Sequence, residues 1–120
     1  MRTIEEKIID ALNGNNGVKN LSCRDRVEVD GGTKKYYLWN SLLFWNDAEN
    51  NYYFSFCGYS THTTKSRLNA IFNYFNLGCF YQKNYVVYWT NNGSIKIEVD
   101  TTKKYKIVFF DNNAVKIEEV

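Results

Sequence analysis

The sequence predicts an α+β domain in which two helices pack on a mostly antiparallel sheet of six to seven strands. Two stretches carry apolar residues at helical spacing, and the other apolar residues fall in short runs separated by turn residues such as Asp30-Gly31-Gly32. These stretches follow one another in the order α-β-β-β-α-β-β-β-β, which is typical of an α+β domain. No internal repeat or linker interrupts the 120 residues, so we expect a single domain over residues 1–120.

The first helix is predicted from about Thr3 to Asn13. Thr3-Ile4-Glu5-Glu6 has the spacing of a capping box, and Asn13-Gly14 is typical of a helix end. Between these signals, apolar residues recur at helical spacing at Ile4, Ile8, Ala11 and Leu12. The polar segment Asn15-Asn16-Gly17 that follows is expected to be a loop.

Three strand-forming segments are predicted between the two helices. Val27-Glu28-Val29 alternates into the turn Asp30-Gly31-Gly32, which indicates a hairpin. In the segment from Lys34 to Trp45, aromatic and aliphatic residues occupy both odd and even positions, as in a strand that is covered on both faces or used for binding. Tyr52 to Cys57 is its expected antiparallel neighbour, because the polar residues 46–51 suit a surface connection.

The second helix is predicted from about Thr63 to Asn76, and Gly78 is expected to end it as a left-handed cap. Its apolar stripe consists of Leu68, Ile71, Phe72 and Phe75. Further strand segments follow, separated by turns at Asn92-Gly93 and Asn112-Asn113. These segments are Phe80 to Thr90, Ile95 to Val99, Tyr105 to Phe110 and Val115 to Glu118.

Composition and charge restrict the function classes. The net charge of +2 is too small to attract nucleic acid strongly by itself, so any basic surface must be local. The sequence has neither an apolar run long enough to span a bilayer nor a signal-like start, and we expect a protein of the host cell cytoplasm without a membrane partner. The odd number of cysteines, with no CxxC spacing, predicts reduced thiols.

The start of the second helix is a candidate site for an anion or a partner protein. Its first-turn N–H groups have no internal partners and carry the positive end of the helix dipole, so hydroxyls and cations there suit a phosphate or a carboxylate. The alternative is ordinary capping by the hydroxyls with solvated cations, although Lys and Arg are electrostatically unfavourable in the first turn of a helix. The candidate residues are Thr61, Thr63, Thr64, Lys65 and Arg67, with Lys83 on the following strand.

Aromatic residues form a second candidate surface. Aromatics make up 18% of the chain, more than a small core usually needs, so some are expected at the surface. An open face could stack unpaired bases or anchor a protein partner; a covering helix or a homodimer would bury it instead. The candidate surface residues are Tyr36, Trp39, Trp45, Tyr53, Tyr85 and Trp89.

Catalytic and metal signatures are absent from the sequence. His62 is the single histidine and lies five residues from Cys57, but neither a third orienting group nor paired ligands at short spacing accompany them. Carboxylates such as Asp25 and Asp47 are explained by turns, and no phosphate-binding glycine loop is present. We therefore expect a protein that is not an enzyme and needs neither a cofactor nor a metal.

Two central segments carry a resemblance to a known family. Gly58 to Asn69 reads Gly-aromatic-x-Thr-x-Thr-Thr-Lys-x-Arg-aliphatic-Asn, and Tyr81-Gln82-Lys83 opens an aromatic strand that ends near Trp89. This pattern resembles a family of small uncharacterised proteins of tailed bacteriophages. Tyr59 stands where that family more often has Trp, and Ser60 stands where a cation is common. The resemblance implies a phage or prophage origin and no particular chemistry.

These observations favour a small binding protein of phage type. Our first expectation is a non-enzymatic inhibitor that binds a host protein stoichiometrically, and the host protein is expected to handle nucleic acid, as in anti-defence or anti-CRISPR inhibition. The alternative is an accessory protein that binds nucleic acid directly through the basic helix start and the aromatic strands. A structural or dimeric virion-associated protein is the third class.

Overall fold

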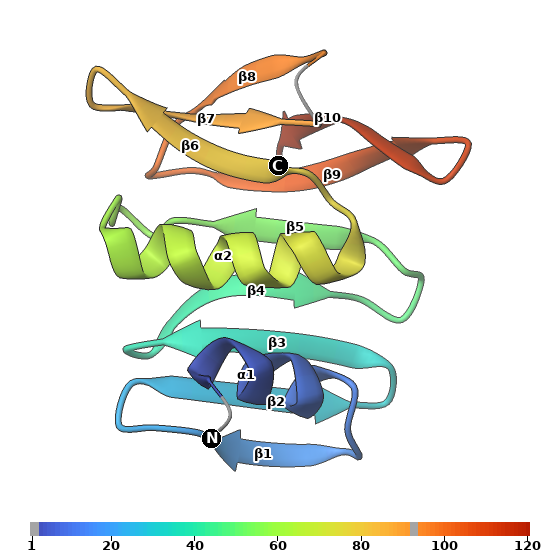
Figure 1. Cartoon of the computed structure of the whole chain (residues 1–120). Helices are drawn as coiled ribbons and strands as arrows, with labels where there is room; N and C mark the ends of the chain where they lie inside the picture. Colours follow the sequence, from blue (N-terminus) through green and yellow to red (C-terminus); the bar gives the residue numbers. More distant parts are fainter. Residues whose placement is uncertain (1–2, 92–93) are drawn as a thin grey trace.

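Two helices and ten strands make up the described part of the chain, residues 3–91 and 94–120, in a computed structural model (Figure 1). The strands form two antiparallel sheets, one of seven strands in the order β1-β2-β3-β4-β5-β9-β10 and one of three in the order β6-β7-β8. The bounds are α1 Ile4–Leu12, β1 Gly17–Asn20, β2 Asp25–Asp30, β3 Thr33–Leu38, β4 Ser41–Asn46, β5 Tyr52–Ser55, α2 His62–Phe75, β6 Cys79–Lys83, β7 Val86–Thr90, β8 Lys96–Val99, β9 Lys104–Phe110 and β10 Asn113–Glu119.

The predicted α+β class is confirmed, with both helices in their predicted places in the chain. Each helix begins at a threonine cap: Thr3 accepts a hydrogen bond from the Glu6 N–H at 3.2 Å, and Thr61 accepts one from the Thr64 N–H at 3.2 Å. The apolar stripes of both helices face the core as their spacing predicts, with Ile4 and Phe75 half-buried and the other stripe residues buried.

The left-handed cap of α2 is Asn76, with φ 58°, and not Gly78 as the sequence suggested. Asparagine tolerates this conformation, so the helix does not need a glycine at its end. Gly78 serves a different purpose. Its φ is +99°, and a Cβ atom there would lie 2.5 Å from the Thr90 carbonyl oxygen and 2.7 Å from the Trp89 Nε1. The glycine therefore allows β7 to approach the chain that leaves α2.

Two segments that the sequence predicts as single strands are hairpins. Residues 34–45 fold back at Trp39-Asn40, and residues 80–90 fold back at Asn84-Tyr85. Both central residues of each turn have positive φ, as type I′ turns require. An aromatic residue is not a turn signal, so the pattern concealed both reversals. The loop predicted at Asn15-Asn16-Gly17 is also corrected, because strand β1 begins at Gly17. The predicted Asn92-Gly93 turn lies outside the described residues.

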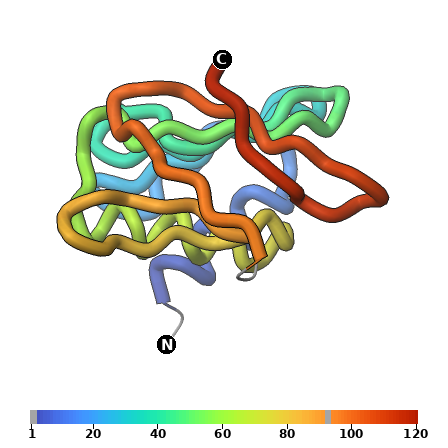
Figure 2. The backbone as a smooth tube through the Cα atoms, turned by 90° about the horizontal axis from the view of Figure 1, so that it is seen from above, coloured from blue at the N-terminus to red at the C-terminus, as the bar shows by residue number. Residues whose placement is uncertain are grey.

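The large sheet is covered on one face only. Figure 2 shows both helices and the β6–β8 sheet on the same side of the seven strands. The core lies between these layers and includes an aromatic cluster of Phe54, Phe56, Phe72 and Phe80, with ring centroids 4.7–6.4 Å apart. The other face of the large sheet, which we call the open face, is not covered by any described element (Figure 2).

Candidate functional site

The cation Arg67, predicted to attract an anion at the start of α2, is paired within the chain. Its side chain is buried and its Nε donates a hydrogen bond to Asp25 Oδ1 at 3.0 Å, while its Nη1 donates one to Glu5 Oε1 at 3.0 Å. A cation near the positive end of a helix dipole needs a negative partner, and two carboxylates of the protein provide it. The expectation that Arg67 contacts an external anion thereby loses its support.

Asp25 is the centre of this buried network and does not belong to a turn as its sequence context suggested. It is the first residue of β2 and is only 1% exposed. Besides Arg67, the hydroxyl of Tyr36 donates a hydrogen bond to its carboxylate, and so does the hydroxyl of Ser22 at 2.7 Å. Each of these donors favours the ionised carboxylate. The network joins α1, β2, β3 and α2 into one unit.

Acidification is expected to weaken the fold through Asp25. Burial alone raises the pKa of this carboxyl, but hydrogen bonds from Tyr36, Ser22 and Arg67 outweigh burial and hold the pKa below its ordinary value of 3.8. A lowered folded-state pKa contributes stability that is complete well above the ordinary value and is lost as the pH falls toward the folded-state pKa. We expect the free energy of unfolding to fall between about pH 5 and about pH 2, less steeply in Asp25→Asn. Urea titrations followed by tryptophan fluorescence measure both slopes; equal slopes would contradict the assignment.

The two predicted lysines lie beside the helix start on the α2–β6 side. The Nζ of Lys65 contacts Gln82 Oε1, and Lys83 is exposed at the end of β6. Asn69 fixes β6 against α2, because its amide group exchanges hydrogen bonds with the Phe80 N–H at 2.7 Å and with the Phe80 carbonyl at 3.1 Å. Neither lysine lines the pocket described next.

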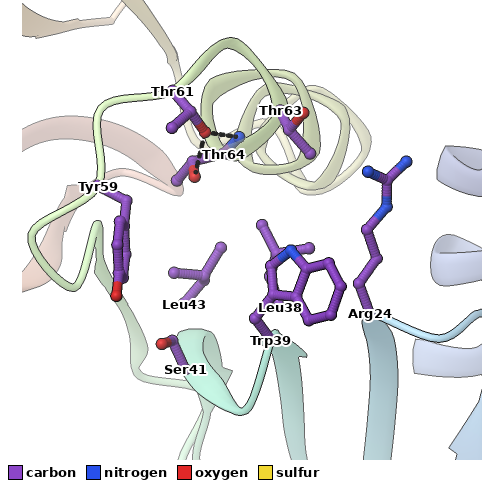
Figure 3. Close-up of a pocket in the computed structure, with 9 residues that line it drawn as sticks. All are labelled: Arg24, Leu38, Trp39, Ser41, Leu43, Tyr59, Thr61, Thr63 and Thr64. Carbon is purple, nitrogen blue, oxygen red and sulfur yellow. Dashed lines mark hydrogen bonds between the residues drawn. The ribbon is translucent and has the colours of Figure 1, made fainter.

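A pocket of about 390 Å³ opens at the start of α2 (Figure 3). It is formed at the end of the molecule where the β1–β2 loop, the β3–β4 turn and the start of α2 come together, on the left of Figure 1. Its lining is mostly apolar, and among the described residues that form it Arg24 alone is charged. The lining residues are Arg24, Leu38, Trp39, Ser41, Leu43, Tyr59, Thr61, Thr63 and Thr64.

The side chains of the pocket are arranged as two aromatic walls around an aliphatic floor. Figure 3 shows Tyr59 and Trp39 on opposite sides of Leu43, with Leu38 at the indole and Arg24 on the side of the indole away from Tyr59. Trp39 is 65% exposed and Tyr59 is 58% exposed. The hydroxyls of Thr61 and Thr64 lie 2.9 Å apart and are hydrogen-bonded to each other. The pocket therefore suits an apolar or aromatic group that carries a negative charge toward Arg24.

Trp39 adopts a backbone conformation that is unfavourable for a large side chain. Its φ is 51°, in the left-handed region, at the first position of a two-residue turn where asparagine or glycine is preferred. This conformation costs a residue other than glycine about 1–2 kcal/mol. Most of the indole is exposed, so burial offsets little of that cost. An exposed tryptophan at such a position is typical of a functional site.

The other aromatic candidates are divided between the core and the surface. Tyr36 and Trp89 are fully buried, and Trp89 donates a hydrogen bond to the Leu77 carbonyl at 2.9 Å, so neither can contact a partner. Trp45 and Tyr53 are half-buried neighbours on the open face. Tyr85 is 96% exposed at the β6–β7 turn, the second two-residue turn with an aromatic residue at positive φ.

Sequence reasoning found part of the pocket and missed the rest. The three threonines and Trp39 were candidates, whereas Arg24, Tyr59 and the leucine floor were not. Arg24 lies in a loop whose distance from α2 the sequence does not reveal. Tyr59 was visible only as one residue of the Gly58 to Asn69 motif. In the described ranges, no three His, Cys, Asp or Glu side chains gather as metal ligands, and neither helix is long and apolar enough to cross a membrane.

Comparison with known proteins identifies a family. The model of the family described as Kyanoviridae Gp96 protein matches residues 1–118, which is nearly the whole chain and includes both segments of the phage-type motif. No curated protein matches the chain, and no solved structure matches it. The match supports the resemblance to a phage protein family, but it does not test whether the motif from Gly58 to Asn69 is characteristic of that family.

Proposed function

The chain belongs to the Kyanoviridae Gp96 protein family, a family of phage proteins, and on that premise we propose that it acts by stoichiometric binding to a host protein, without a catalytic step. The observation that carries the proposal is the pocket between Trp39 and Tyr59, at which an exposed tryptophan is held in an unfavourable conformation. Tryptophan, tyrosine and arginine are the residue types that dominate binding energy at protein interfaces. All three line this pocket.

The partner group that enters the pocket is an apolar or aromatic side chain next to a carboxylate. The leucine floor and aromatic walls favour the ring or aliphatic chain, and Arg24 favours the carboxylate. The Arg24 side chain is 44% exposed and its Nε lies 3.8 Å from Asp25 Oδ2, so it keeps donors for a partner. We further propose that the host protein handles nucleic acid and is inhibited by this contact, as in anti-CRISPR inhibition; the phage origin of the family is the reason for choosing a host protein as the partner.

Replacing Trp39 by asparagine is expected to abolish partner binding without weakening the fold. The indole is lost, while asparagine suits the positive φ of the turn and removes a cost of about 1 kcal/mol or more. The tagged protein and the variant are compared by quantitative mass spectrometry of host lysate proteins retained at equal loading. Thermal unfolding of both proteins is measured in parallel, and the variant should melt at the same temperature or higher.

Tyr74→Ala is the matched control. Tyr74 is 55% exposed, close to the 58% of Tyr59, but it lies in the last turn of α2, away from the pocket. A partner that the wild type and Tyr74→Ala retain and that Trp39→Asn and Tyr59→Ala lose would support the proposal. Equal retention by all four proteins would exclude the pocket as the site, and no specific retention by the wild type would contradict stoichiometric protein binding.

A further inference from the structure

The β1–β2 loop, which carries Arg24, is held in shape by the side chain of Ser22. The Ser22 Oγ accepts hydrogen bonds from the Arg24 N–H at 3.1 Å and from the Asp25 N–H at 3.0 Å. It also donates one to Asp25 Oδ2 at 2.7 Å. One exposed serine hydroxyl therefore satisfies two backbone donors of the loop and connects them to the buried carboxylate.

The same loop holds the turn at which Trp39 lies. The Trp39 N–H donates a hydrogen bond to the Arg24 carbonyl at 2.8 Å, which extends the β2–β3 ladder by one residue. The carbonyl of Arg24 and the N–H of Asp25 belong to one planar peptide unit. A rotation of this unit would break the hydrogen bonds to Ser22 and to Trp39 together. Ser22 thereby fixes the direction of the carbonyl to which Trp39 is bound.

The opposite side of the pocket is attached to the same carboxylate. Asp25 Oδ2 accepts the hydrogen bond from Ser22 of the loop, whereas Oδ1 accepts one from Arg67 on α2. The start of α2 contributes three threonines to the pocket lining, and the loop and the β3–β4 turn contribute Arg24 and Trp39. The two oxygens of a carboxylate have a fixed separation, so one buried group holds the two sides of the pocket together.

We propose that Ser22 is the positioning residue of the pocket: it keeps the Trp39 indole and the Arg24 guanidinium in the arrangement that a partner recognises. This inference rests on the proposed function of the pocket. Side chains that are ordered before binding lose less conformational entropy on binding, so affinity depends on the fraction of molecules in which the arrangement already exists. The positive φ of Trp39 makes such support necessary, because an unsupported turn relaxes toward a more favourable conformation.

The chain reversal has a second support that does not involve Ser22. The Asn40 side-chain Oδ1 accepts a hydrogen bond from Arg26 Nη1 at 2.8 Å, and the Arg26 guanidinium lies 4.2 Å from the centroid of the Tyr37 ring. Removing the Ser22 hydroxyl is therefore expected to reorient the Trp39 residue while the β3–β4 hairpin stays folded.

The three tryptophans of the chain provide a direct test by ¹⁹F NMR after labelling with 5-fluorotryptophan. Trp39 reports on the pocket, Trp45 on the open face and Trp89 on the core; Trp39→Asn and Trp45→Phe assign the resonances. Ser22→Ala should shift or broaden the Trp39 resonance alone and should lower the retention of a host protein about tenfold. Ser22→Thr keeps the hydroxyl and should restore the wild-type resonance and the wild-type retention.

Two control variants separate positioning from a general loss of stability. Ile107→Val removes a methyl group from the core, where the residue is 2% exposed, and should lower the melting temperature. It should leave the Trp39 resonance and the retention of the host protein unchanged. Ser94→Ala removes an exposed serine hydroxyl outside the pocket lining and should change none of the three measurements.

Two kinds of result would overturn the inference. One is a Trp39 resonance that is unchanged in Ser22→Ala, or an equal change at all three tryptophans. The other is wild-type retention by Ser22→Ala when Trp39→Asn loses the host protein. Failure of the proposed function is a separate result, because the wild type and Trp39→Asn would then retain the same proteins or none. The NMR measurement would still decide whether Ser22 positions Trp39.

Discussion

Replacing Arg67 by alanine is expected to lower the free energy of unfolding by about 3–5 kcal/mol. The substitution leaves Asp25, which is 1% exposed, without the cation that is hydrogen-bonded to it, because Arg24 is more distant at 3.8 Å, and it leaves Glu5 without its hydrogen bond from Nη1. An ionised carboxylate that loses its partner inside a protein must either stay charged at a large desolvation penalty or bind a proton. Urea unfolding followed by tryptophan fluorescence measures the loss, and circular dichroism shows whether the variant still folds.

A double variant and an exposed pair provide the controls for Arg67→Ala. Asp25→Asn combined with Arg67→Met removes both charges, and we expect it to lose less stability than the two single variants added together. Lys103→Ala breaks the exposed pair with Glu119 and is expected to cause no measurable change. If Arg67→Ala were as mild as Lys103→Ala, the network would not be a stabilising centre of the fold.

Replacing Gly78 by alanine is expected to cost about 2–5 kcal/mol. The positive φ of +99° is unfavourable for alanine, and the added Cβ would also meet the Thr90 carbonyl oxygen at 2.5 Å. Because that oxygen belongs to the backbone of β7, the strand itself must move to relieve the contact. The Trp89 ring is close to the same point and would shift with it, disturbing its hydrogen bond to the Leu77 carbonyl.

Gly58→Ala separates the two contributions to the Gly78 effect. Gly58 has a similar φ of +83°, but no heavy atom lies within 4 Å of the position of its Cβ. The Gly58→Ala variant should therefore lose only the conformational part, about 1–2 kcal/mol. Thermal and urea unfolding of the two variants side by side give the difference. Equal losses would show that β7 accommodates the methyl group and that the close approach does not require glycine.

The fold class followed from periodicity, and turn signals predicted the β2–β3 hairpin and the antiparallel pairing of β4 with β5. The division of the strands between two sheets was not predicted. Capping residues and apolar stripes placed both helices correctly, since these are local signals. The chain reversals at Trp39-Asn40 and Asn84-Tyr85 were not predicted, because aromatic residues are disfavoured in tight turns. Which strands join the large sheet and which form β6–β8 depends on contacts across the core. Such contacts have no local sequence signal.

For the functional surfaces, the sequence identified candidate residues but not their contacts or their exposure. Of the two cations at the start of α2, Arg67 has negative partners, but they are Glu5 and Asp25, which lie far away in the sequence, and Lys65 contacts the neutral amide of Gln82. The alternation of residue types identified the aromatic strands, but it did not show whether the odd or the even positions of each strand face solvent. As a result, Tyr36 and Trp89 were grouped with Trp45 and Tyr53, although the first two are core residues. Only the assembled sheet separates the two groups.

The buried network also constrains how the protein forms during synthesis. Arg67 is 42 residues after Asp25 and 62 residues after Glu5. Until α2 has left the ribosome, α1 and the first three strands would have to enclose the Asp25 carboxylate without its hydrogen bond from Arg67, with Arg24 at 3.8 Å as its nearby cation. The early segments therefore gain little by folding alone, and they become stable together with α2 when the second half of the chain arrives.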